Sequence, residues 1–203
     1  RTADLYDGPY LRELPDLQGL PEIQFVAACD PVKDSQDYVD WSRDGLRSLL
    51  ANAMGRPDWR RNRSGIPGGR EVAKEVIETI YAKQRDKKEF KGCATYTDFR
   101  ELLEKEEDVN AVWIMTPDHL HATVAIAAMK QGKHVRLHKP LANRLRESRL
   151  VIETARQTKV ATHFQPASDG ASLRPIKSWI DQGAIGTLRE IHNWSNRPVW
   201  PQY

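Results

Sequence analysis

A lysine between a histidine and a proline follows an apolar run in the second half of the chain. The run KHVRL (residues 133–137) indicates a buried strand, and His138, Lys139 and Pro140 come directly after it. At the carboxyl end of such a strand, an ammonium group could meet a nicotinamide ribose and a substrate hydroxyl, orient the alcohol and assist proton transfer as hydride leaves. The residues alone also fit a surface lysine before a turn proline.

An acidic residue ends another apolar run. Asp30 follows IQFVAAC (residues 23–29) and precedes a proline. A carboxylate at a strand end can accept hydrogen bonds from the two adenosine ribose hydroxyls and would repel a 2′-phosphate, which favours NAD while leaving NADP possible. Asp-Pro also commonly starts a turn, and the residues alone leave both interpretations open.

The segment TPDHLH joins a strand end to a helix start at residues 116–121. Free backbone N–H groups there favour a phosphate or a ribose edge, so we assign Thr116, Pro117 and His121 to cofactor binding. His119 and His121 are two residues apart on a helix and point to different sides. They make a poor metal pair, and no metal site is expected.

Apolar runs alternate with amphipathic segments along the chain. Strands are predicted at residues 23–29, 111–115, 133–137 and 160–164, and helices at residues 99–105, 118–130 and 143–158. The helix at residues 99–105 would begin at an Asp98 or Thr97 cap. Nearly all-apolar strands separated by helices predict an α/β fold with a parallel sheet that is covered on both faces. Ligands then bind at the carboxyl ends of the strands.

Two stretches depart from this alternation. Helices are predicted at residues 43–54 and 69–83, and we interpret an insertion at about residues 43–92 as a decoration on the rim of the sheet. A helix at residues 173–182 is followed by a turn at residues 183–186. An alternating segment at residues 187–194 then predicts the first strand of a new sheet with one exposed face. We expect one domain at residues 1–165 and the truncated start of another at residues 166–203.

No glycine-rich dinucleotide fingerprint precedes Asp30. Only Gly8 and Gly19 lie before it, and residues 1–10 contain no apolar run, so the first strand of the sheet is also expected to be missing. Because the downstream pattern is intact, we interpret the chain as truncated at its N-terminus rather than as carrying a degenerate nucleotide site.

The composition excludes several classes of protein. The 203 residues are 39% hydrophobic and 29% charged with a net charge of +3, and basic and acidic residues are interleaved. Nucleic-acid binding therefore has no electrostatic support, and the basic stretch at residues 59–63 is interpreted as a solvated loop. No apolar run is long enough for a membrane span. Cys29 and Cys93 lack disulfide or metal-ligand spacing, and Cys29 is expected to be a small core residue.

Several segments in a fixed order resemble one enzyme family. TPDHLH (residues 116–121), AAMKQGKHV (127–135), KPLA (139–142) and GAIG (183–186) are similar to the glucose-fructose oxidoreductase/inositol dehydrogenase (Gfo/Idh/MocA) family. The closing WSNRPVWPQ (residues 194–202) resembles a branch of that family. The resemblance runs from about Ile23 to Tyr203, apart from the insertion.

The resemblance implies a Rossmann-type NAD(P)-binding domain and a C-terminal α/β domain whose open antiparallel sheet often forms the interface of a homo-oligomer. Members mostly oxidise or reduce hydroxyl groups of sugars and cyclitols, and some are NAD-dependent glycosidases. Lys139 matches the lysine that contacts cofactor and substrate, and its bond to Pro140 is commonly cis. We assign the flanking His138 and Pro140 to cofactor binding as well. In the closing segment, Arg197 and Trp200 could line a substrate pocket or pack in an interface.

Three features depart from the family pattern. The residue before the lysine is His138 where the family has glutamate, the glycine-rich loop is not present, and the family's catalytic Asp/His pair lies beyond Tyr203. By itself the chain is therefore expected to do no complete chemistry.

The leading hypothesis is a hydride transfer between NAD(P) and a hydroxyl of a sugar, cyclitol or related molecule. An NAD-dependent glycoside hydrolase and a non-catalytic sugar sensor or scaffold are the alternatives. The compartment stays open, because relatives occur both in the cytoplasm and as proteins exported with twin-arginine signals.

Overall fold

The computed structural model describes residues 2–5, 14–38, 43–63, 66–84, 90–165 and 173–192. The chain divides into two compact units, residues 1–167 and residues 168–203, which are described separately below. Among the described residues, no helix combines the length and the apolar character that crossing a bilayer requires.

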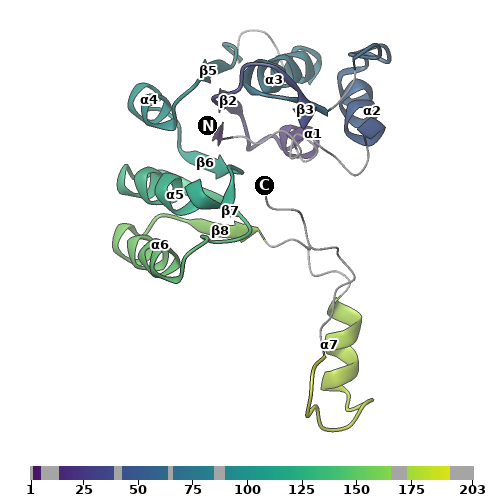
Figure 1. The fold of residues 1–203 in the computed structure, drawn as a ribbon, viewed down its shortest axis with the longest axis vertical. Coiled ribbons are helices and arrows are strands. Elements are labelled where there is room, and N and C mark those ends of the chain that lie inside the picture. Colours follow the sequence, from purple (N-terminus) through teal and green to yellow (C-terminus); the bar gives the residue numbers. More distant parts are fainter. Residues whose placement is uncertain are drawn as a thin grey trace. The chain divides into compact units, whose positions relative to one another are not determined.

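The first unit is built on a six-stranded sheet whose neighbouring strands all run parallel (Figure 1). The order across the sheet is β5-β2-β1-β6-β7-β8, so the direction of winding reverses between β1 and β6. This is the order of a doubly wound dinucleotide-binding sheet, and it confirms the predicted Rossmann-type α/β class. The strands are β1 (Thr2–Leu5), β2 (Phe25–Cys29), β5 (Ala94–Tyr96), β6 (Ala111–Ile114), β7 (His134–His138) and β8 (Thr162–Gln165).

The prediction that the first strand is missing is wrong. Residues Thr2–Leu5 form β1 in the middle of the sheet, with Ala3 opposite Ala27 of β2 on one side and opposite Val112 of β6 on the other. A four-residue strand paired on both sides is held by the backbone hydrogen bonds of two neighbours. Such a strand can form without an apolar run, and β1 was not predicted because residues 1–10 contain no such run.

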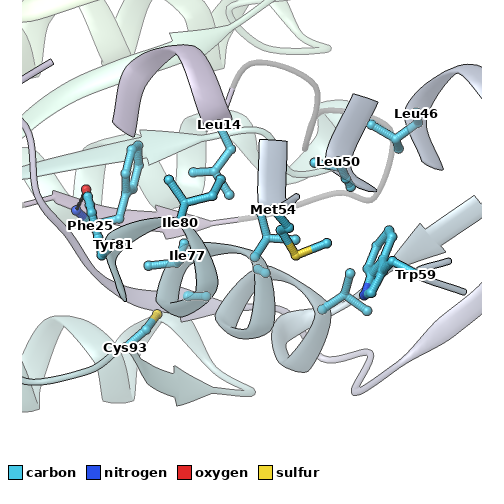
Figure 2. Close-up of a cluster of buried hydrophobic side chains, with 14 of the residues drawn as sticks. Leu14, Phe25, Leu46, Leu50, Met54, Trp59, Ile77, Ile80, Tyr81 and Cys93 are labelled. Carbon is cyan, nitrogen blue, oxygen red and sulfur yellow. Dashed lines mark hydrogen bonds between the residues drawn. The ribbon is translucent and has the colours of Figure 1, made fainter. Parts of the chain in front are cut away.

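One face of the sheet carries the helices that come early in the chain. Leu14 of α1, Leu50 of α2 and Ile77 of α3 pack with Phe25 and Trp113 of the sheet into one buried cluster (Figure 2). These helices are α1 (Leu14–Gln18), α2 (Arg43–Met54) and α3 (Arg70–Gln84).

The opposite face carries a second buried cluster. Val112 and Ile114 of β6 belong to it, whereas Trp113 between them belongs to the first, as the alternation of side chains along a strand requires. Its helices are α4 (Phe99–Lys105), α5 (His121–Lys130) and α6 (Leu145–Thr158). Asp98 caps α4 by accepting from the Arg100 N–H, as predicted. Cys29 is buried, also as predicted, and burial raises the pKa of its thiol to about 12.

The helices predicted near residues 43–54 and 69–83 are confirmed, but α3 is not a rim decoration. It is the crossover between β2 and β5, and Val76, Ile77 and Tyr81 are buried at the centre of the first cluster. The Tyr81 hydroxyl accepts a hydrogen bond of 3.0 Å from the backbone N–H of Phe25. The small antiparallel ribbon of β3 (Ser35–Tyr38) and β4 (Ile66–Gly68) was not predicted.

The second unit contains α7 (Leu173–Asp181), which confirms the helix predicted there. The strand predicted at residues 187–194 is wrong over 187–192, which have no regular secondary structure, and residues 193–194 lie outside the described part. A strand needs a hydrogen-bonding partner, and the described residues of this unit offer only a helix and a turn. Leu188 and Ile191 are accordingly exposed.

Candidate functional site

The polar residues singled out in the sequence follow parallel strands near the middle of the sheet. Asp30 follows β2, Thr116 comes two residues after β6, and Lys139 directly follows β7. Because β2, β1, β6 and β7 are consecutive in the sheet, their carboxyl ends share one edge (Figure 1). That edge contains the reversal of winding where such sheets bind ligands.

Asp30 is buried and closes the loop after β2. Its Oδ1 accepts a hydrogen bond of 2.7 Å from the Val32 N–H, and its own N–H donates to the Tyr96 carbonyl. The Asp-Pro turn considered from the sequence is therefore present. A role for Asp30 towards a ribose stays a prediction.

Arg70 contacts the same loop, and sequence reasoning missed it. Its Nη1 donates to the carbonyls of Asp30 and Pro31, at 3.1 and 3.0 Å. Its backbone N–H donates to the Val32 carbonyl, and the N–H of Glu71 donates to that of Lys33. The loop after β2 is thus hydrogen-bonded to the first turn of α3. Residues 30 and 70 are far apart in the sequence, and no local sequence pattern predicts this contact.

The glycine before Arg70 permits this close packing. Gly69 has φ +100, in the region that L side chains rarely adopt, and a Cβ there would lie 2.7 Å from the Lys33 carbonyl oxygen. Only a residue without a side chain fits between α3 and the loop. The Gly68-Gly69 pair is the sequence signal that could have suggested a tight turn here.

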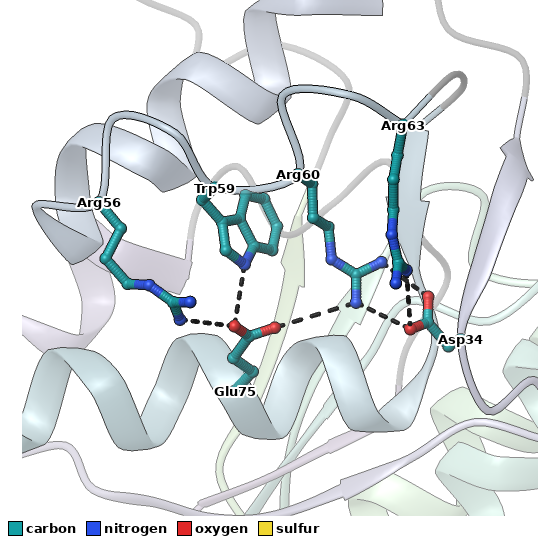
Figure 3. Close-up of polar contacts among 6 residues, drawn as sticks. All are labelled: Asp34, Arg56, Trp59, Arg60, Arg63 and Glu75. Carbon is teal, nitrogen blue, oxygen red and sulfur yellow. Dashed lines mark hydrogen bonds and ion pairs between the residues drawn. The ribbon is translucent and has the colours of Figure 1, made fainter.

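The stretch at residues 59–63 is only partly the solvated loop that was predicted (Figure 3). Trp59 is buried, and Arg60 makes two hydrogen bonds, of 2.7 and 2.8 Å, to the Asp34 carboxylate. This guanidinium lowers the pKa of Asp34 below its ordinary value of 3.8. The Arg60 side chain is 12% exposed, whereas that of Arg61 is 76% exposed and matches the prediction.

Glu75 of α3 joins this stretch to the helix. Its Oε1 accepts from Arg56 at 2.6 Å and from the Trp59 indole N–H at 3.0 Å, and its Oε2 lies 3.9 Å from Arg60 (Figure 3). Residues 56–63 are thereby held on α3 beside residues 30–34. We call Asp34, Arg60, Glu75 and Arg70 the α3 clamp.

The loop after β6 carries Thr116 and Pro117. Thr116 is half-buried, and its hydroxyl oxygen is enclosed without a hydrogen-bond partner in the part of the chain that the structure describes. Pro117 is exposed, and a 3₁₀ turn, Asp118–Leu120, then leads into α5. No side chain caps that turn.

His121 does not face open space, although the sequence analysis assigned it to the cofactor. The ring is 1% exposed, with Nε2 2.7 Å from the Thr116 carbonyl oxygen and Nδ1 2.5 Å from that of Pro140. Its neighbour His119 is exposed. No group of metal-ligating side chains occurs in the described ranges.

The loop after β7 carries the lysine. His138 is the buried last residue of β7, opposite Gln165 of β8. Lys139 is exposed, and its ammonium makes no hydrogen bond or ion pair with the described residues. The Lys139–Pro140 bond is cis, as the family resemblance implied. Arg197 and Trp200 lie outside the described residues.

Comparison with known proteins agrees with this geometry. The sequence profile of an oxidoreductase family with an NAD-binding Rossmann fold, GFO_IDH_MocA, matches residues 57–165, more than half of the chain. The chain belongs to the Gfo/Idh/MocA family. The matched residues include the loops after β6 and β7, and the predicted family membership is confirmed.

Two relatives within the Gfo/Idh/MocA family carry different activities in their names. Levoglucosan dehydrogenase of Pseudarthrobacter phenanthrenivorans is 32% identical over 114 residues, which are 52% of this chain and 28% of that protein. An alpha-N-acetylgalactosaminidase of Shewanella oneidensis is 32% identical over 122 residues, which are 58% of this chain and 25% of that protein.

A solved structure shares the fold. The WlbA dehydrogenase of Bordetella pertussis, in complex with NADH and UDP-GlcNAcA, superposes with a TM-score of 0.58 at 16% identity. The superposition covers 90% of this chain and 43% of the other. The chain therefore spans less than half the length of each of these proteins.

Proposed function

We propose that the full-length protein is an NAD-dependent oxidoreductase that moves hydride to or from a hydroxyl of a sugar, cyclitol or related small molecule. The observation that carries the proposal is the exposed ammonium of Lys139, uncommitted among the described residues, at the carboxyl end of β7. It lies on the sheet edge where doubly wound folds bind dinucleotides. Levoglucosan dehydrogenase, a relative that names a sugar-derived substrate, supports the substrate class.

The residues along this edge fit a dinucleotide. Asp30 would accept from the adenosine ribose hydroxyls, which favours NAD over NADP. The Thr116 hydroxyl is an enclosed polar atom that a cofactor hydroxyl or phosphate would satisfy. The N–H groups of Asp118 and His119, where no side-chain cap competes, suit a phosphate or ribose edge.

The chemistry of Lys139 follows from its charge. When bound, a nicotinamide supplies the hydride acceptor or donor. Nζ of Lys139 donates a hydrogen bond to the substrate hydroxyl oxygen and stabilises the negative charge that develops there as the C–H bond breaks. Residue 138 is a histidine where the family has glutamate, so it supplies no carboxylate to hold the ammonium.

An NAD-dependent glycoside hydrolase is the second candidate. It is favoured by the relative named as an alpha-N-acetylgalactosaminidase, which matches 58% of this chain. In such an enzyme the oxidation would be transient, and no net change in the redox state of the cofactor would accumulate. The absorbance of reduced nicotinamide during steady-state turnover separates the two candidates.

The test uses the full-length protein. NAD and NADP binding are measured by calorimetry, and turnover is measured over a panel of polyols, sugars and glycosides. We expect NAD to bind more tightly than NADP, and Lys139→Ala to lower kcat by roughly 100-fold or more. Lys130→Ala, at the exposed end of α5, is the matched control and should retain activity. No binding of either nucleotide would reject the oxidoreductase and leave a sensor or scaffold.

A further inference from the structure

A buried histidine connects the loops that follow two neighbouring strands. His121 is the first residue of α5, and its ring lies between the carbonyls of Thr116 and Pro140. Thr116 belongs to the loop after β6, and Pro140 belongs to the loop after β7. The imidazole therefore bridges the backbone of the loop after β6 and the backbone of the loop after β7.

The bridge ends one residue from the reactive lysine. Pro140 directly follows Lys139, so fixing the Pro140 carbonyl restricts where the Lys139 backbone can lie. Lys139 itself is exposed, and its side chain makes no hydrogen bond or ion pair with the described residues. The position of its ammonium therefore depends on its backbone, for which His121 is an anchor.

The identity of the anchoring side chain is set by hydrogen-bond chemistry. Both facing groups are carbonyl oxygens, which can only accept. A ring that donates to both must carry a proton on each nitrogen, whereas a ring with one proton would set a lone pair against the other carbonyl. A phenyl ring of similar size would fill the space and donate to neither.

We propose that His121 is a positioning residue, which holds Lys139 and the Thr116 loop in register by donating to both carbonyls. The consequence for catalysis rests on the proposed function. Because a shift of about 1 Å in a reacting group can cost roughly 100-fold in rate, losing the bridge should lower kcat far more than it weakens nucleotide binding. The adenosine end of the cofactor would meet the loop after β2, where His121 makes no contact.

The kinetic experiment compares His121→Phe and His121→Gln with wild type in the full-length protein. His163→Phe and His163→Gln, at an exposed histidine of β8, are the matched controls. We expect His121→Phe to lower kcat by roughly 10- to 100-fold, while the Kd for NAD, which also depends on the Thr116 loop, rises by a smaller factor. Glutamine keeps N–H donors and should restore part of kcat. A folded His121→Phe variant with the kcat of wild type would overturn the proposal.

A second measurement does not depend on turnover. Nitrogen chemical shifts of the His121 ring, assigned by comparison with His121→Gln, report which ring nitrogens carry protons. Protons on both nitrogens in the wild-type protein support the double bridge, and a single proton overturns it. If wild type neither binds nucleotide nor turns over substrate, the proposed function fails. The ring measurement would then still decide whether the bridge exists.

Discussion

On the β2 side of the sheet, the loop of residues 30–34 is held by several independent contacts. The guanidinium of Arg70, the first N–H groups of α3 and the pairing of Arg60 with Asp34 all act on it. On the β6–β7 side, the loops carrying Thr116 and Lys139 are joined through one imidazole. The first arrangement suits the proposed adenosine end of the site, which would only bind the cofactor. In the second, one side chain holds the backbone beside the proposed reactive lysine, so little would compensate if the bridge were lost.

Breaking the packing between α3 and its loop should give the largest effect on stability. Gly69→Ala puts a Cβ 2.7 Å from the Lys33 carbonyl oxygen at φ +100, and we expect a loss of about 2–3 kcal/mol in the free energy of unfolding. Denaturant unfolding measures it. Gly132→Ala is the control, because φ is +75 there but nothing lies within 4 Å, and we expect about 1 kcal/mol. Equal losses in the two variants would show that the close approach is unimportant.

Changing the charge inside the clamped loop should alter nucleotide choice. Asp30→Asn keeps an oxygen that can accept from the Val32 N–H and removes the negative charge that would repel a 2′-phosphate. We expect the preference for NAD over NADP to fall by roughly tenfold, about 1.4 kcal/mol. Calorimetry on the full-length protein checks this, with Asp58→Asn in an exposed turn as the control. An unchanged preference would assign Asp30 to the turn alone.

Removing one member of the α3 clamp should have a smaller effect. Glu75→Gln weakens the contacts with Arg56, Trp59 and Arg60, and we expect a loss of about 1 kcal/mol, since the side chain is one-third exposed. Thermal unfolding checks it. Glu101→Gln, which breaks an exposed pair with Lys105, should change stability less. A larger loss of stability in Glu101→Gln than in Glu75→Gln would contradict the role of the α3 clamp.

Acid should loosen the same clamp slightly. Arg60 depresses the pKa of Asp34 below 3.8, so the pair contributes stability above that pH and loses it as the pH falls through the folded-state pKa. Asp34→Asn should therefore show a shallower loss of stability on acidification below pH 3.8. Because the carboxylate is over one-third exposed, we expect a difference under about 1 kcal/mol. If wild type and Asp34→Asn lose the same amount of stability on acidification, the prediction is contradicted.

Local patterns predicted the parts of the fold that have local causes. The apolar runs that became β2, β6 and β7 are largely buried by the covering helices, and Asp98 caps the helix that follows it. The run that became β8 forms a strand at the end of the sheet, where Phe164 is exposed. β1 was not predicted because Thr2–Leu5 forms a strand through its pairing with β2 and β6 rather than through an apolar pattern of its own. The strand expected after residue 187 failed for the converse reason, since alternation without a partner does not make a strand.

The location of the candidate site has a similar explanation. Position at the end of a strand placed Asp30, Thr116 and Lys139 on one edge of the sheet, because that edge follows from strand order, and their roles stay predictions. The contact of Arg70 with Asp30 joins positions forty residues apart, and the orientation of His121 depends on a carbonyl nineteen residues away. Such contacts exist only once the chain is folded.

The central place of β1 has a consequence for the sheet as a whole. β2 and β6 are not hydrogen-bonded to each other, and each pairs with β1 along four residues. Displacing Thr2–Leu5 would divide the sheet into β5-β2 and β6-β7-β8, with no ladder between them. Asp30 would then lie on one piece and Lys139 on the other. This four-residue strand thus keeps the two ends of the proposed site at a fixed distance.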